Sequence, residues 1–123
     1  MSSSPLPSHQ TPAPRLDPPV LGTPWTRSAT KIALLGAGEI GKEVTIALKR
    51  YGCTVIAADS YEGAPAMQVA DSSLVFDMSD GRALREVLDE VEVDLIVPEV
   101  EAIATDELSA AEERGVCVVP NAF

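Results

Sequence analysis

Residues 31–43 read KIALLGAGEIGKE, an apolar run followed by three closely spaced glycines and a charged segment. An apolar run that ends at glycine is typical of a buried parallel strand. Gly36, Gly38 and Gly41 follow the spacing G-x-G-x-x-G. In that spacing the first glycine allows a tight turn, the second lets a ligand or another backbone approach, and the third lets a helix pack closely on the sheet. The stretch therefore predicts a strand, a loop and a helix in direct succession.

The same alternation continues along the chain. Asp80 is placed to cap the second helix, and Ile40, Val44, Ala47 and Leu48 are placed on one face of the first. We expect strands at residues 31–36, 53–59, 73–78, 94–99 and 116–120, helices at 39–52, 80–91 and 103–115, and a short helical turn within 64–71. This order predicts an α/β fold, a Rossmann-like doubly wound parallel sheet of about five strands with helices on both faces.

Charge and proline content divide the chain into two parts. Residues 1–30 hold seven of the ten prolines and a balance of +1 from two Arg and one Asp. Residues 31–123 hold seven Lys/Arg and eighteen Asp/Glu, a balance of −11. We expect residues 1–20 to be a disordered Pro/Ser-rich tail and residues 21–123 to be one domain. So acidic a domain argues against nucleic acid and anionic lipid as partners.

Several other classes of function are disfavoured by what the chain contains. No apolar run approaches the ~20 residues of a membrane span, and cytoplasm is the default location. His9, in the tail, is the only histidine, so a zinc site or a histidine-based triad is not expected, and we predict no metal site and no catalytic residue in this chain. Cys53 and Cys117 lie in apolar runs and are expected to be buried structural thiols.

Ligands of doubly wound sheets bind beyond the carboxyl ends of the strands. This rule selects residues 36–41, 59–65 and 98–105. A dinucleotide is one candidate ligand, because Asp59 lies 23 residues after Gly36, where an acid grips a ribose hydroxyl in NAD-binding proteins. Glu39 counts against it, because a carboxylate at the start of the helix repels a pyrophosphate.

A second hypothesis assigns the acids themselves to the ligand. Glu39 follows the first strand, and Glu99 and Glu101 follow the fourth in an otherwise apolar segment. Carboxylates there can receive a hydroxyl, an amine or a cation. The alternative that these are solvated acids at a helix end and in a loop remains open on spacing alone.

Four blocks carry a family resemblance: LLGAGEIGKEVTIALKRYGCTVIAAD, YEGAPAMQVAD, IVPEVEAIATDEL and VVPNA. Together they closely resemble the N-terminal, pre-ATP-grasp domain of formate-dependent phosphoribosylglycinamide formyltransferase, an ATP-grasp enzyme of purine biosynthesis, from about Leu21 to Ala122. The resemblance implies that Glu39 and Ile40 of the G-E-x-G block, and Glu99 of the V-P-E-x-E block, contact glycinamide ribonucleotide. Gly36, Gly38 and Gly41 then serve the geometry of the loop.

The resemblance also implies what lies outside this chain. The family enzymes continue into an ATP-grasp domain that binds ATP and Mg²⁺, so we expect those sites beyond Phe123, no cofactor here, and little activity from these residues alone. A homodimer is implied as well. The alternatives are a stand-alone NAD-binding Rossmann module, in which Asp59 would bind the ribose, and a non-catalytic dimerisation or interaction domain.

Overall fold

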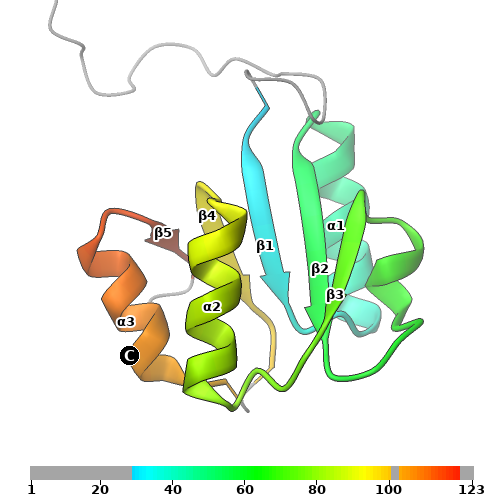
Figure 1. Cartoon of the computed structure of the whole chain (residues 1–123). Coiled ribbons are helices and arrows are strands. Elements are labelled where there is room, and N and C mark those ends of the chain that lie inside the picture. The colour runs from blue at the N-terminus through cyan, green and yellow to red at the C-terminus, as the bar shows by residue number, and fades with distance from the viewer. Residues whose placement is uncertain (1–28, 101–102, 120–123) are drawn as a thin grey trace, which may run out of the picture.

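The computed structural model describes residues 29–100 and 103–119. Strands and helices alternate as the sequence predicts (Figure 1). In chain order the elements are β1 (Lys31–Leu35), α1 (Glu39–Arg50), β2 (Thr54–Asp59), the 3-10 turn η1 (Pro65–Gln68), β3 (Ser72–Val75), α2 (Gly81–Val91), β4 (Leu95–Pro98), α3 (Thr105–Glu113) and β5 (Cys117–Val118). The predicted tail, residues 1–20, lies outside the described residues.

All five strands are parallel and stand in the order β3-β2-β1-β4-β5. The chain moves from β1 outward to β3, then crosses back to place β4 on the other side of β1. Helix α1 and η1 cover one face of the sheet, and α2 and α3 cover the other (Figure 1). The predicted doubly wound α/β fold is therefore confirmed.

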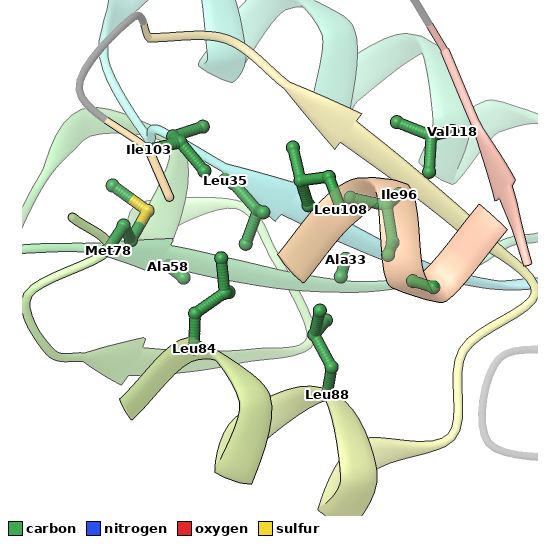
Figure 2. Close-up of a cluster of buried hydrophobic side chains, with 11 residues drawn as sticks. Ala33, Leu35, Ala58, Met78, Leu84, Leu88, Ile96, Ile103, Leu108 and Val118 are labelled. Atoms are coloured by element: carbon green, nitrogen blue, oxygen red, sulfur yellow. The ribbon is translucent and has the colours of Figure 1, made fainter. Parts of the chain in front are cut away.

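Side chains of the central strands alternate between two cores, as the pleat of a strand requires. Ala33 and Leu35 of β1 join the core under α2 and α3, whereas Leu34 joins the core under α1 and η1. Leu84 and Leu88 of α2 point into the first core beside the sheet (Figure 2). Aliphatic side chains thus fill both faces of the sheet, which leaves the ends of the strands for ligands.

The second helix begins where the sequence predicts. Asp80 is its N-cap, and its side chain accepts hydrogen bonds from the backbone N–H groups of Arg82 and Ala83 at 3.0 and 3.3 Å. Such a cap satisfies amide groups that the first turn of a helix leaves without partners. Strands β3, β4 and β5 are shorter than predicted. Of these, β3 and β5 have a neighbour on one side only, whereas β4 pairs with both β1 and β5.

The predicted inward face of α1 was wrong in part. Its buried residues are Gly41 and Thr45, whereas Ile40 is 70% exposed and Ala47 is exposed. The side of the helix that packs on the sheet carries a glycine and a threonine, which a search for apolar residues at helical spacing does not select. A glycine permits that approach, and the Thr45 hydroxyl donates a hydrogen bond to the Gly41 carbonyl at 2.8 Å, which satisfies it in the core.

The prediction of two buried thiols was also wrong. Cys117 is exposed and Cys53 is half-buried, and both are free thiols. Cys117 lies on the two-residue edge strand β5, where only Val118 reaches the core. An apolar run at the edge of a sheet is covered on fewer sides than the same run at its centre.

Candidate functional site

The strand order reverses at β1, which has β2 on one side and β4 on the other. This switch point is where ligands bind in open α/β sheets. A hollow of about 340 Å³ opens there, at the carboxyl ends of β1 and β4. Residues of the β1–α1 loop, the first turn of α1 and the end of β4 line it: Gly38, Glu39, Ile40, Gly41, Glu99 and Val100. The structure thus brings together all three residues that the resemblance assigned to the substrate.

Two of the three glycines are required where the β1–α1 loop contacts the end of β4 and the start of α1. Gly36 has a φ of +110°, and a Cβ built on it would lie 2.7 Å from Val100 Cγ1 and 3.2 Å from the Val100 backbone N. Gly41 has no room either, because its Cβ would lie 2.8 Å from the Gly36 carbonyl oxygen. Glycine at these positions lets the loop touch the β4 segment and lets α1 touch the loop.

Gly38 behaves differently. A Cβ built on it would meet no atom within 4 Å, and its φ of −76° suits any residue. The fold of the described residues therefore does not require glycine here. Since Gly38 lines the hollow, its missing side chain leaves space for a ligand rather than for the protein.

Two carboxylates and two apolar side chains surround that space. Glu39 is exposed in the first turn of α1, and Glu99 is half-buried, with its backbone N–H donating to the Leu35 carbonyl at 2.8 Å. Ile40 and Val100 are 70% and 40% exposed. No basic residue is among the lining residues that the structure describes. The hollow can accept hydrogen bonds from hydroxyl or amino groups and has no basic side chain among these lining residues to pair with a phosphate. Glu101 lies outside the described residues.

Asp59 does not point a free carboxylate at this space. Its Oδ2 accepts a hydrogen bond from the Ala37 backbone N–H at 2.8 Å, and its Oδ1 accepts from the Ser60 N–H at 2.7 Å. Each oxygen of this carboxylate, which can accept two hydrogen bonds, already accepts one from the protein backbone, so Asp59 has a structural role in the loop that the dinucleotide hypothesis does not assign to it. Sequence spacing could not reveal this role, because the same acid at the same position serves either purpose.

Another hollow, of about 520 Å³, lies at the amino ends of the strands. It is lined in part by Lys31, Leu88, Asp94 and Arg114, near the ends of α2 and α3. It lies away from the carboxyl ends of the strands, so its size does not make it the ligand site of this fold.

Two ionisable groups away from the switch-point hollow have shifted pKa values. Hydrogen bonds from the Ser79 hydroxyl and backbone N–H lower the pKa of Asp77. Burial raises the pKa of the Cys53 thiol, although Lys49 opposes this shift. Among residues 29–100 and 103–119, no group of three or more His, Cys, Asp or Glu could hold a metal ion, and no helix is long and apolar enough to cross a bilayer.

Fold and site together define a class of protein, a Rossmann-like domain whose switch-point loop carries acids in place of a phosphate-binding surface. Residues 29–123 match the family described as the ribonucleotide synthetase preATP-grasp domain. The chain belongs to this family, as the fold class and the motif resemblance predicted.

Curated relatives and solved structures agree with this assignment. The chain is 59% identical over 103 residues to the formate-dependent phosphoribosylglycinamide formyltransferase of Alcanivorax borkumensis, a match that covers 84% of this chain and 26% of that protein. It is similar to the structure of glycinamide-RNase-transformylase T from Mycobacterium tuberculosis, with a TM-score of 0.73, 40% identity and coverage of 75% of this chain and 29% of that one.

A more distant match is the N5-carboxyaminoimidazole ribonucleotide synthetase of Thermotoga maritima, with a TM-score of 0.68, 28% identity and coverage of 76% of this chain and 25% of that one. The chain spans about a quarter of the length of the curated relatives it matches. The family resemblance drawn from the sequence blocks is therefore confirmed for this part of those proteins.

Proposed function

We propose that this chain is the N-terminal substrate-binding part of an ATP- and formate-dependent formyltransferase that acts on glycinamide ribonucleotide. One observation carries the proposal: Glu39, Ile40 and Glu99, which come from two distant segments, line one hollow at the switch point. The names of relatives at 53–59% identity support the same substrate.

The chemistry of the hollow fits the sugar and amine of this substrate. Glu39 and Glu99 can accept hydrogen bonds from ribose hydroxyl or amino groups, and a hydrogen bond to a charged group contributes about 1.5–3 kcal/mol. Ile40 and Val100 offer apolar contact beside them. The phosphate of the substrate finds no cation among the described lining residues, so this part supplies only a portion of the binding energy.

ATP and Mg²⁺, which the family implies, do not fit the residues described here. The described part of the chain has no acid cluster suited to a metal ion, and Glu39 occupies the first turn of α1, where a phosphate would otherwise be favoured. We propose that residues beyond Phe123 bind both, and we derive no step of the reaction through them from this chain.

A titration of the isotope-labelled chain with glycinamide ribonucleotide tests the proposal. Amide resonances of residues 38–41 and 99–100 are expected to shift, with a Kd on the order of 1 mM or weaker for an incomplete site. Glu39→Gln and Glu99→Gln should each weaken binding about tenfold. Glu86→Gln is the matched control, because Glu86 is exposed on α2 and outside the hollow. Shifts that are no smaller in the two site variants than in the control would refute the assignment.

The same experiment separates the alternatives. NAD should produce no shifts at these positions, because Glu39 in the first turn of α1 repels a pyrophosphate. Micromolar NAD binding that Asp59→Ala abolishes would restore the dinucleotide hypothesis. In a protein that also carries the ATP-grasp domain, Glu39→Ala should lower kcat/KM for glycinamide ribonucleotide and leave the KM for ATP nearly unchanged.

The homodimer implied by the resemblance remains a prediction, as does the cytoplasmic location. Sedimentation of the purified chain over a range of concentrations tests the former. A monomer at the highest concentration would show that this part of the protein does not carry a dimer interface on its own.

A further inference from the structure

One residue of the glycine loop, Ala37, is held through both of its backbone polar groups. The Ala37 N–H donates to Asp59 Oδ2 at 2.8 Å, and the Ala37 carbonyl accepts from the Ala66 N–H at 2.8 Å. Ala37 is 0% exposed, so water cannot replace either partner. A buried amide without a partner is costly, and these two bonds therefore fix the loop in one place.

Asp59 also joins this loop to the next one. Its second carboxylate oxygen accepts from the Ser60 N–H at 2.7 Å, at the carboxyl end of β2. One side chain thus connects the loop after β1 to the turn after β2. Glu39 begins α1 two residues after Ala37.

The other wall of the hollow is fixed independently. The Glu99 N–H donates to the Leu35 carbonyl at 2.8 Å, which continues the pairing of β4 with β1. The Gly36 backbone lies against Val100, within the distance that excludes a Cβ. The separation of Glu39 from Glu99 therefore depends on where the loop is held between Asp59 and the end of β4.

We propose that Asp59 is a positioning residue of the switch-point site, which sets the place of Glu39 relative to Glu99 through its hydrogen bond to the Ala37 N–H. The inference rests on the proposed function for the identity of the ligand. In this proposal the Asp59 carboxylate binds the backbone of the loop, although its position in the sequence is typical of an acid that binds a ribose. Asp59 acts through the loop and does not touch the substrate.

The chain contains a matched control for this role. Asp71 Oδ2 also accepts from a backbone N–H, that of Val55 at 2.8 Å, and it pairs with Lys49 at 2.6 Å. These bonds lie near the amino end of β2, whereas the hollow lies at the carboxyl ends of the strands. Asp71→Ala should therefore destabilise the fold without moving the site, whereas Asp59→Ala should alter the site.

Titration with glycinamide ribonucleotide, followed by amide resonances, measures how each variant changes the affinity for the ligand. Asp59→Ala should weaken binding about tenfold, and Asp71→Ala less than about twofold, at a temperature where both are folded. Asp59→Asn should fall between wild type and Asp59→Ala, because the amide oxygen can still accept from Ala37 while its NH₂ group faces the Ser60 N–H. Equal binding by the Asp59→Ala and Asp71→Ala variants would overturn the proposal.

Hydrogen exchange of the Ala37 amide supplies a readout that needs no ligand. In Asp59→Ala, exchange of the Ala37 amide should become about tenfold faster than the change in global stability of that variant accounts for. In Asp71→Ala, it should change only as far as global stability changes. If the wild-type chain binds no ligand but Ala37 exchange responds as expected, the proposed function fails and the loop-positioning role stands. If Ala37 exchange does not respond to loss of Asp59, the positioning role is refuted whatever the ligand does.

Discussion

Replacing the three glycines of the loop one at a time by alanine tests the geometry of the switch point. Gly36 has a φ of +110°, and its Cβ would lie 2.7 Å from Val100 Cγ1 and 3.3 Å from the Glu99 carbonyl carbon. Gly41 would place a Cβ 2.8 Å from the Gly36 carbonyl oxygen and 3.2 Å from Leu34 Cδ2. Gly38 has open space and a negative φ. We therefore expect three different costs from one chemical change.

The magnitudes follow from two separate penalties. A residue with a Cβ at positive φ costs about 1–2 kcal/mol, and an added methyl group in a filled space costs about 1–3 kcal/mol. Gly36→Ala incurs both and should lose about 2–5 kcal/mol of the free energy of unfolding. Gly41→Ala incurs only the second, and the better helix propensity of alanine offsets up to about 1 kcal/mol of it. Gly38→Ala should change stability by less than about 0.5 kcal/mol.

Thermal and urea unfolding followed by circular dichroism measure these differences. A domain of this size loses about 4–8 °C in Tm per kcal/mol, so Gly36→Ala should melt roughly 8–40 °C below wild type. Gly38→Ala should melt within a few degrees of wild type and yet bind ligand more weakly, since its Cβ enters the hollow. A Gly36→Ala variant as stable as Gly38→Ala would refute the claim that the loop and the β4 segment need this contact.

Two further outcomes can be measured on the same chain. Cys117 should react with a thiol reagent faster than Cys53 at neutral pH, because Cys117 is exposed and burial raises the pKa of Cys53. The reaction rate of Cys53 should keep rising with pH above the range in which an ordinary thiol titrates. Equal rates for the two thiols at neutral pH would contradict this prediction. Glu107→Gln should lower stability by no more than about 1 kcal/mol in urea unfolding, because the Arg85 side chain that Glu107 accepts from at 3.3 Å is 61% exposed; a larger loss would show that the pair holds α2 to α3.

The order of elements could be predicted from the sequence because each depends on neighbours along the chain. Apolar runs, helical periodicity and the Asp80 cap are local, and they predicted every strand and helix of the described residues to within a few positions. Strands β3, β4 and β5 were predicted too long. How far a strand is covered depends on what packs beside it, which no local pattern records.

The candidate residues of the site were also accessible from the sequence. Parallel strands bring their carboxyl ends to one edge, so Glu39 and Glu99 were expected on the same side of the sheet before their positions were known. That they line one hollow required the strand order, which places β4 directly beside β1. A different order would have separated them by the width of another strand.

The fold class, the glycine loop and the acids that follow the strands can be read from the amino-acid order, because short-range sterics and hydrophobic periodicity are encoded residue by residue. The role of Asp59, the glycines that the fold needs and the buried face of α1 could be identified only in the folded domain. A hydrogen bond between residues 22 positions apart, or the 2.7 Å between a missing Cβ and a valine methyl group, depends on how separate segments pack, and that packing exists only after the chain has folded.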